Sequence, residues 1–400
     1  MFEHVQAYPG DPILSLNEDF QKDPRVGKVN LTIGIYFDEA GRIPVMAAAR
    51  EAEAALLADI GPRPYLPMAG LPAYRDLVQE LVFGAGSAAR RAGRIATVQT
   101  LGGSGALKVG ADFLKRYFPK SEVWVSDPSW ENHRTIFEGA GFAVHTYPYY
   151  DDASGGLRFD EMLATVGGLP AGGSVVLLHA CCHNPTGVDL DRAQWDALIP
   201  VLRERGLIAF VDMAYQGFGD GLDDDAYAVR ALAEAGVTCV VANSFSKNFS
   251  LYGERCGGLS VVCETAEQAG CVLGQLTSTI RAIYSNPPTH GARIVAQVLG
   301  TPALRQSWEA ELGAMRERIQ AMRRAIHDGL AGRVEPRMLQ RYLSQRGMFT
   351  YTGLGAEQVE TLRRDQGVYL LRSGRMCVAG LNRDNVAVAA DAIASVLARG

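Results

Sequence analysis

Six short apolar segments alternate with amphipathic stretches through the middle of this 400-residue chain. Strands that are apolar on both faces and are joined by helices are typical of a mainly parallel sheet covered by helices. Between the first two segments, Ala106, Val109, Phe113 and Tyr117 recur at helical spacing. The sequence therefore predicts an α/β fold. The six predicted strands are 95–100, 122–127, 142–147, 174–180, 207–212 and 237–243.

The pattern changes after Pro302, where apolar residues recur every three or four positions as far as Leu330. This spacing predicts one long helix. A coiled-coil seam is an alternative, but we prefer a core-facing helix that links two domains. Shorter apolar segments and helical patterns then alternate in an α+β manner. We predict a large domain over 45–305, a smaller domain from 13–44 and 306–400, and an N-terminal arm over 1–12.

Composition and charge exclude several classes of protein. The net charge of −5 argues against binding to nucleic acid. The first residues lack the features of a signal peptide, and no run of 18 apolar residues could span a membrane. Seven cysteines without paired spacing indicate reduced thiols in a cytoplasmic protein. We therefore expect a cytoplasmic protein that acts on small molecules.

Cys181, Cys182 and His183 raise the question of a metal site. Adjacent cysteines suit zinc poorly, and the second pair of ligands that a zinc site needs is missing. We interpret these residues as structural and predict no metal.

Polar residues follow several of the predicted strands. Ligands of an open parallel sheet bind outside the carboxyl ends of its strands. Asp212 ends one apolar strand, and Lys247 follows another within the sequence SFSKNFSLYGER. A helix cap is the simpler explanation for Asp212, but a buried carboxylate also invites a cation. A desolvated lysine is more readily neutral, and a neutral amine can form a Schiff base.

Gly103 and Ser104 lie in a glycine-rich turn that opens a predicted helix, where backbone amides suit a phosphate. The turn matches neither a Walker A loop nor the dinucleotide fingerprint. Ser244, Ser246 and Arg255 would add hydroxyls and a cation. An aldehyde for the lysine, a phosphate for the turn and a ring nitrogen for Asp212 together point to pyridoxal 5'-phosphate.

The whole chain resembles the class I (fold type I) aminotransferases that depend on pyridoxal phosphate. The motifs SFSKNFSLYGERCGG, LGGSGAL, SDPSWENH, CCHNPTG, FVDMAYQGF, RAIYSNPP and SGRMCVAG carry the resemblance, in the order of the family. LPMAG, CCHNPTG and FSLYGER are most similar to the bacterial aromatic-amino-acid enzymes. Asn248 and Asn286 also suit the aspartate enzymes.

The resemblance implies roles for the cofactor-binding residues. Lys247 would form the Schiff base and move the substrate proton, and Asp212 would keep the pyridinium nitrogen protonated, with His133 supporting it. Tyr215 and Asn184 would bond the phenolic oxygen. Trp130 would stack on the ring. The phosphate would be held by Gly103, Ser104, Ser244, Ser246 and Arg255, and by Tyr65 from the other subunit of a homodimer.

The resemblance also implies how substrates bind. Arg375 would pair with the α-carboxylate, and the backbone at Gly34 would close over the substrate. Arg281 of the neighbouring subunit would meet a distal carboxylate and would swing aside for an aromatic ring, while Asn286 would steady the site. We expect transfer of the amino group from tyrosine, phenylalanine and aspartate to 2-oxoglutarate by a ping-pong reaction.

Other functions stay open at this point. An aspartate aminotransferase with little aromatic activity is the nearest alternative. The fold also hosts decarboxylases, lyases and racemases. A non-catalytic binding protein would retain the scaffold without the chemistry, and a nucleotide-binding turn at 101–110 ranks last.

Overall fold

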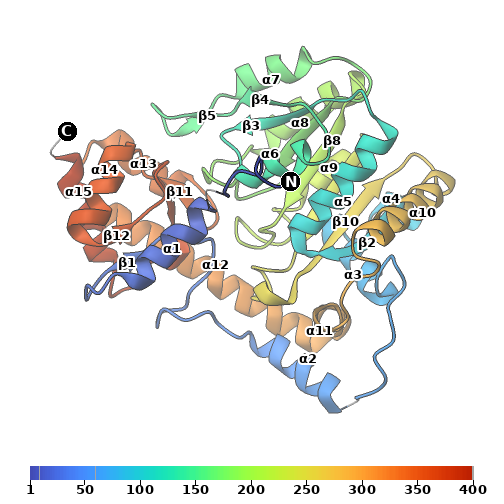
Figure 1. Cartoon of the computed structure of the whole chain (residues 1–400), viewed down its shortest axis with the longest axis horizontal. Helices are drawn as coiled ribbons and strands as arrows, with labels where there is room; N and C mark the ends of the chain where they lie inside the picture. The colour runs from blue at the N-terminus through green and yellow to red at the C-terminus, as the bar shows by residue number, and fades with distance from the viewer. Residues whose placement is uncertain (9, 59, 399–400) are drawn as a thin grey trace.

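A seven-stranded sheet forms the centre of the protein (Figure 1). The computed structural model describes residues 1–8, 10–58 and 60–398. The strand order is β2-β10-β9-β8-β7-β3-β4. Only β10 runs antiparallel to its neighbours within this sheet. The strands are β2 (Ile95–Leu101), β3 (Val123–Asp127), β4 (Val144–Pro148), β7 (Val175–His179), β8 (Ile208–Met213), β9 (Cys239–Ser244) and β10 (Cys256–Val262).

Alternate side chains of the sheet enter two different cores, as the two-residue period of a strand requires. In β8, Ile208 and Phe210 pack on one side, whereas Ala209 and Val211 pack on the other. Both faces are therefore covered, and this explains why the strands are apolar throughout. The first core includes residues of α5 (Gly102–Tyr117), α6 (Glu131–Glu138) and α10 (Ala266–Ile283). The second includes residues of α3 (Pro72–Phe83), α7 (Phe159–Gly167), α8 (Arg192–Glu204) and α9 (Tyr227–Glu234).

The long predicted helix is α12 (Pro302–Leu330), which begins at the proline that marks the change of pattern. Its buried positions include Trp308, Leu312 and Ile319, so the apolar stripe faces the core. It packs against α2 (Ala47–Ala58) and α11 (His290–Gly300). It also packs against α13 (Pro336–Ser344) and α15 (Val386–Leu397), which Figure 1 draws in orange and red.

The C-terminal part is joined to the beginning of the chain. β1 (Val29–Asn30) pairs in parallel with β12 (Val368–Tyr369), and α1 (Pro12–Lys22) precedes it. β11 (Phe349–Tyr351) pairs antiparallel with β13 (Arg375–Cys377). The remaining regular elements are α4 (Ala88–Arg91), β5 (Tyr150–Asp151), β6 (Gly156–Leu157) and α14 (Ala356–Thr361), with short turns of helix at Tyr252–Glu254, Leu362–Gln366 and Val378–Gly380.

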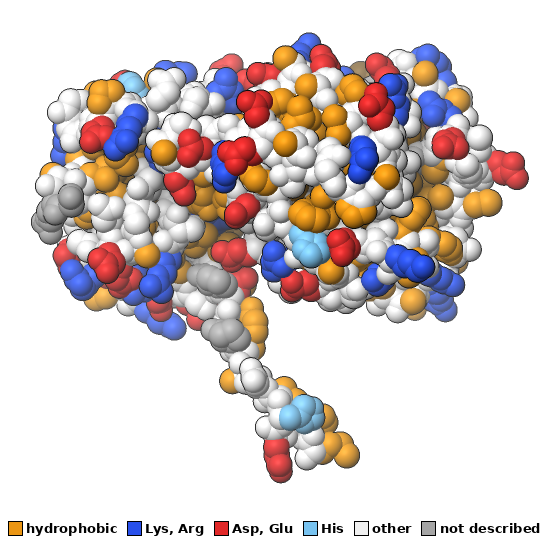
Figure 2. All heavy atoms as spheres, turned by 90° about the horizontal axis from the view of Figure 1, so that it is seen from above, with side chains coloured by type: hydrophobic (Ala, Val, Ile, Leu, Met, Phe, Trp, Pro, Cys, Tyr) orange, Lys and Arg blue, Asp and Glu red, His pale blue; other side chains and the backbone are white. Residues whose placement is uncertain are grey.

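The N-terminal segment leaves the body of the molecule as a slender arm (Figure 2). Its large apolar side chains are exposed, with Met1 at 98% and Tyr8 at 78% of their full accessibility. Among the described residues, no helix has both the length and the apolar character needed to cross a membrane.

Candidate active site

The carboxyl ends of β7, β8 and β9 open into a cavity of about 310 Å³. Twelve of the residues predicted from the sequence line this cavity. They are Gly34, Gly103, Ser104, Trp130, Asn184, Asp212, Tyr215, Ser244, Ser246, Lys247, Arg255 and Arg375. The sheet topology explains the convergence, because parallel strands place the residues that follow them at one edge.

Lys247 is half-buried at one wall of this cavity. Burial lowers the pKa of its amine to about 8, although the charge of Asp212 acts in the opposite direction. The Nζ atom lies 4.9 Å from the centre of the Tyr215 ring. A lysine in this setting reaches the neutral, nucleophilic form much closer to neutral pH than an exposed lysine does.

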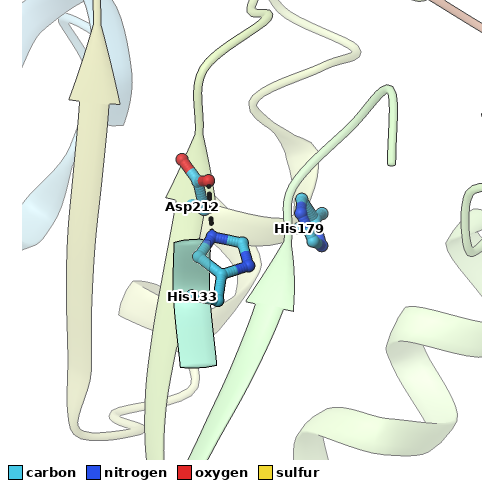
Figure 3. Close-up of side chains that lie close together, drawn as sticks. All are labelled: His133, His179 and Asp212. Atoms are coloured by element: carbon cyan, nitrogen blue, oxygen red, sulfur yellow. Dashed lines mark hydrogen bonds and ion pairs between the residues drawn. The ribbon is translucent and has the colours of Figure 1, made fainter. Parts of the chain in front are cut away.

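Asp212 is fixed by a histidine behind it. His133 Nε2 lies 3.0 Å from Asp212 Oδ2 (Figure 3). On the other side of the ring, His133 Nδ1 lies 2.9 Å from Ser129 Oγ. Burial alone would raise the pKa of Asp212, but the hydrogen bond and charge of His133 lower it below its usual value. The carboxylate therefore stays ionised and can face a protonated ring nitrogen.

Two further histidines follow His133 through successive ring contacts. His179 lies beside His133, with ring centres 5.2 Å apart, and neither of its nitrogens has a hydrogen-bond partner among the described residues. His183 lies beside His179 at 4.3 Å and is bonded through both nitrogens, to Ser126 and Thr186. Burial lowers the pKa of His179 to about 3, so this ring is neutral.

The phosphate-type pocket is built where α5 begins. Gly102 has a φ of +64°, which favours glycine, and a Cβ there would crowd the guanidinium at 2.7 Å from Arg255 Nη2. Arg255 is itself left-handed at a φ of +54°, and its carbonyl accepts from the Gly102 amide at 3.0 Å. Non-glycine residues in this region are strained, and such strain concentrates at functional sites.

Hydroxyl groups complete this pocket. Ser246 Oγ accepts from Ser244 Oγ at 3.2 Å and from Arg255 Nη1 at 3.4 Å. Together with the first amides of the 16-residue helix α5, these groups make an anion site. A neutralisable amine, a buried carboxylate and an anion site around one cavity fit pyridoxal phosphate.

Arg375 stands on the opposite side of the cavity. Its Nη1 donates to Asn184 Oδ1 at 3.2 Å and its Nη2 to the Thr32 carbonyl at 2.8 Å, whereas Nε has no partner in the described part of the chain. The guanidinium lies 4.4 Å from the centre of the Phe349 ring. Burial lowers the pKa of Arg375, as expected for a cation held ready for an anionic ligand.

The loop that carries Asn184 is held by Asp189, whose carboxylate accepts from the amides of Cys182 at 2.6 Å and His183 at 2.7 Å. Cys181 Sγ, Cys182 Sγ and a carboxylate oxygen of Asp225 lie within 4.8 Å of one another. Asp225 accepts three backbone amides from Gly217, Gly219 and Asp220. This arrangement supports a structural role for the two cysteines.

Three predicted residues do not line the cavity. Tyr65 is 89% exposed, Arg281 is exposed at the end of α10, and Asn286 lies in the loop that follows. Arg281 and Asn286 both donate to Ser285 Oγ. In a single chain these residues are therefore apart from Lys247 and Asp212.

The cavity has further walls that the sequence motifs did not indicate. Asp11 caps α1 through the amides of Ile13 and Leu14, so the start of this helix is brought to the cavity as a fixed unit. An Asp before Pro12 is a recognisable helix start, but this local signal does not place the helix beside the cavity. The additional lining residues are Asp11, Ile13, Leu14, Ile33, Leu107, Ala214 and Phe349.

Comparison with known proteins identifies the family. Residues 26–393 match the model of the aminotransferases of class I and II. The chain belongs to this family and is a pyridoxal-phosphate-dependent aminotransferase.

Relatives narrow the likeness further. The chain is 59% identical to the aromatic-amino-acid aminotransferase of Escherichia coli, over 99% of this chain and all of that protein. It is 51% identical to the aspartate aminotransferase of Pseudomonas aeruginosa, again over 99% of this chain and all of the relative.

Solved structures give the same result. The crystal structure of an aromatic amino acid aminotransferase from Burkholderia cenocepacia is 70% identical, with a TM-score of 0.97 over all of both chains. The aromatic-amino-acid aminotransferase of Burkholderia pseudomallei, covalently bound to pyridoxal phosphate, is 51% identical, with a TM-score of 0.97 over 99% of both.

Proposed function

We propose that this aminotransferase transfers the amino group of tyrosine or phenylalanine, and also of aspartate, to 2-oxoglutarate by a ping-pong reaction. The cavity wall around Arg375 carries the proposal. One buried guanidinium is available for the α-carboxylate, and Phe349 lies beside it. Ile13, Leu14 and Ile33 add apolar surface to the same cavity. Such a wall suits an aromatic side chain, which gains by leaving water.

The cofactor-binding residues would divide the work. When bound, pyridoxal phosphate supplies the electron sink for charge that develops at the substrate Cα. Lys247 would remove and return the proton at that carbon. Asp212, fixed by His133, would hold a proton on the ring nitrogen. Tyr215 and Asn184 would bond the phenolic oxygen. Trp130 would stack on the ring, and the phosphate would lie against Gly103, Ser104, Ser244, Ser246 and Arg255.

Arg375 would bind the α-carboxylate of every substrate, with the backbone at Gly34 closing over it. A Cβ at Gly34 would lie 2.8 Å from Phe349 Cζ, so the close contact with that ring favours glycine. With Gly34 packed on the Phe349 ring, the backbone and this ring could contact a bound substrate together.

We further propose a cytoplasmic homodimer in which Tyr65, Arg281 and Asn286 complete the site of the partner subunit. Tyr65 would reach the phosphate, Arg281 a distal carboxylate, and Asn286 would steady the site. Their position outside the cavity of their own chain supports this assignment. The exposed apolar side chains of the N-terminal arm also favour a partner surface.

We propose the domain boundaries given by the sequence, with a large domain over 45–305 and a smaller one from 13–44 and 306–400. The pairing of β1 with β12 supports the inclusion of the N-terminal segment in the smaller domain. Residues 1–12 would form an arm that contacts the partner subunit.

Aspartate aminotransferase with little aromatic activity is the second candidate, favoured by Asn286 and by the 51% identity to an enzyme of that name. Asn248 does not help to separate the two, because its amide donates to the Gln216 carbonyl at 3.2 Å and it does not line the cavity within the described residues.

Steady-state kinetics with 2-oxoglutarate and aspartate, tyrosine, phenylalanine, tryptophan or leucine would test the proposal. Tyrosine and phenylalanine should react with a kcat/KM well above that of leucine. Rapid turnover of aspartate with aromatic donors no better than leucine would favour the second candidate.

A further inference from the structure

Gln99 hydrogen-bonds to two loops, and neither loop lines the cavity that holds Lys247 of the same chain. It lies on β2, and its side chain is buried, with 1% exposure. The Oε1 atom accepts from the Leu71 amide at 3.1 Å, and Nε2 donates to the Pro288 carbonyl at 2.7 Å. A single amide thus bonds backbone groups 28 residues earlier and 189 residues later in the chain.

The first loop runs from Tyr65 to Leu71 and lies directly on Gln99. The backbone amide of Gln99 donates to the Ala69 carbonyl at 2.9 Å. Gly70 has a φ of +92°, and a Cβ there would lie 2.2 Å from Gln99 Cβ. The loop therefore approaches as closely as a backbone without a side chain allows. This contact holds the loop that carries Tyr65.

The second loop follows α10 and runs from Tyr284 to Pro288. Besides the bond at Pro288, the Tyr284 hydroxyl lies 3.5 Å from the Gln99 carbonyl. Within the loop, Ser285 has a φ of +69° and accepts bonds from Arg281 and Asn286. Gln99 therefore holds the segment that orients Arg281 and Asn286.

We propose that Gln99 is a positioning residue for the active site of the partner subunit. The inference rests on the proposed function, in which Tyr65, Arg281 and Asn286 act across the dimer. Gln99 fixes the phosphate-reaching loop and the carboxylate-binding loop relative to one another, so both enter the partner's site in register. The side-chain amide offers a donor and an acceptor together, as the two bonds to Pro288 and Leu71 require.

Two variants separate the two bonds. Gln99→Leu removes both, and Gln99→Glu keeps an acceptor for Leu71 but has no donor for Pro288. Both should raise the KM for 2-oxoglutarate and aspartate roughly tenfold, while the kcat and the KM for phenylalanine stay close to wild type. Gln99→Leu should also release pyridoxal phosphate faster on dilution, followed by absorbance.

Gln79→Leu is the matched control. Gln79 donates to the Ile95 carbonyl and to Thr97 Oγ1 of the same strand, both at 3.0 Å, and within the described residues its side-chain hydrogen bonds reach neither loop. It should lower the unfolding temperature without the rise in KM for dicarboxylates. If Gln79→Leu raised the KM for 2-oxoglutarate and for aspartate as much as Gln99→Leu does, the effect would be a general structural one, and the inference would be overturned.

Hybrid dimers with two affinity tags decide in which subunit Gln99 acts. In the first hybrid, Lys247→Ala and Gln99→Leu share one subunit, and the other is wild type. In the second, one subunit carries Lys247→Ala and the other carries Gln99→Leu. The single working site should show the raised KM for 2-oxoglutarate in the first hybrid and a wild-type KM in the second.

The opposite pattern, or the same KM in both hybrids, would overturn the role of Gln99. The same pair of hybrids made with Arg281→Ala tests the proposed function separately. If Arg281→Ala acts only when it shares a subunit with the working lysine, the sites are not shared, and the proposed dimer fails on its own evidence.

Discussion

Arg375 Nη1 donates to Asn184 Oδ1 at 3.2 Å, across 191 residues of sequence. The bond joins β13 to the loop after β7, so the arginine that we propose for the substrate carboxylate is held by a residue that we assign to the cofactor. The Thr32 carbonyl fixes the same guanidinium at 2.8 Å, which leaves little freedom for a replacement side chain.

Arg375→Lys should therefore impair every amino acid substrate. Lysine cannot form the planar two-point contact with a carboxylate, and kcat/KM should fall on the order of a hundredfold for aspartate and phenylalanine alike. Arg281→Ala should impair aspartate and 2-oxoglutarate but spare phenylalanine. Steady-state kinetics of both half-reactions check this, and loss of phenylalanine activity in Arg281→Ala would contradict the assignment.

Lys247→Ala should reduce transamination by on the order of a thousandfold or more, because no other amine lines the cavity among the described residues. Lys108→Ala is the control. Lys108 lies on α5, in the glycine-rich stretch, but pairs with Asp112 at 2.5 Å on the surface. Single-turnover absorbance measurements should show wild-type rates for Lys108→Ala; near-normal turnover in Lys247→Ala would refute the mechanism.

His179 should make the fold sensitive to acid. Its pKa is about 3 in the folded protein against an ordinary value of 6.5. Below pH 6.5 the unfolded chain binds a proton that the folded chain does not, so stability falls as the pH drops toward 3. At pH 5 the loss is about 2 kcal/mol.

His179→Leu should remove this part of the acid sensitivity, and its two unpartnered ring nitrogens also disappear from the core. Urea unfolding at pH 7.5 and pH 5, with saturating cofactor, measures the difference. His290→Leu, at an exposed histidine beside Glu53, serves as the control. An unchanged pH dependence in His179→Leu would show that another group carries the effect.

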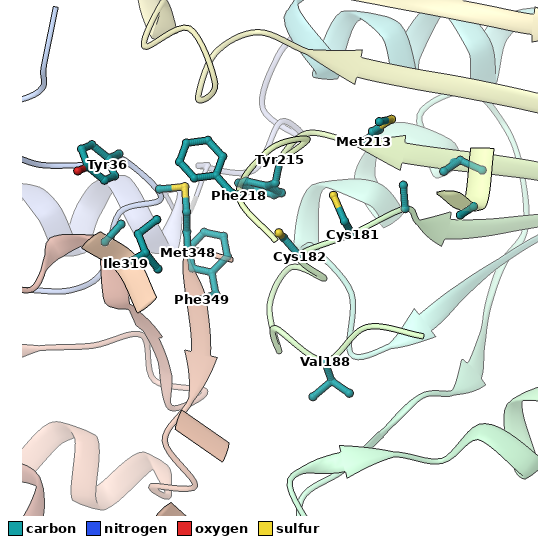
Figure 4. Close-up of a cluster of buried hydrophobic side chains, with 14 of the residues drawn as sticks. Tyr36, Cys181, Cys182, Val188, Met213, Tyr215, Phe218, Ile319, Met348 and Phe349 are labelled. Carbon is teal, nitrogen blue, oxygen red and sulfur yellow. The ribbon is translucent and has the colours of Figure 1, made fainter. Parts of the chain in front are cut away.

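Gly347→Ala should disturb the apolar junction between the Asn184 loop and β11, part of which is drawn in Figure 4. Gly347 has a φ of +72°, and a Cβ there would lie 2.4 Å from Cys182 Cβ. Gly332 has a φ of +73° with nothing within 4 Å of such a Cβ. Both variants bear the left-handed cost of about 1–2 kcal/mol, and only Gly347→Ala adds the clash.

The free energy of unfolding should therefore fall by about 2 kcal/mol more in Gly347→Ala than in Gly332→Ala. Activity should fall with it, because Phe349 and Asn184 lie on the two sides of the contact. An equal decrease in the free energy of unfolding in the two variants would mean that Cys182 moves aside without destabilising the fold.

Periodicity located the strands well, because both faces of the sheet are buried and each strand reads as an apolar run. β8 was predicted over 207–212 and spans Ile208–Met213, and β9 was predicted over 237–243 and spans Cys239–Ser244. β10 was not predicted. Its second and third residues are Gly257 and Gly258, where Gly102 and Asn243 lie too close for a Cβ, so two of its seven positions carry no apolar side chain.

The candidate site was predictable only where residues follow strands or motifs. Asp212 and Lys247 could be found from the ends of apolar runs. Leu14 and Phe349 could not, because they reach the cavity through packing between distant segments. The position of Arg281 away from Lys247 in one chain agrees with the expected dimer but does not test it.

The pairing of β2 with β10 has a consequence for biosynthesis. β2 is the edge strand of the sheet, and Ile95–Leu101 meets its partner Cys256–Val262 only after some 150 further residues. A nascent chain that has not reached Val262 keeps an unpaired apolar strand and an unfinished turn at Gly102–Ser104. Protection of β2 should therefore begin only once ribosome-bound chains have emerged beyond Val262.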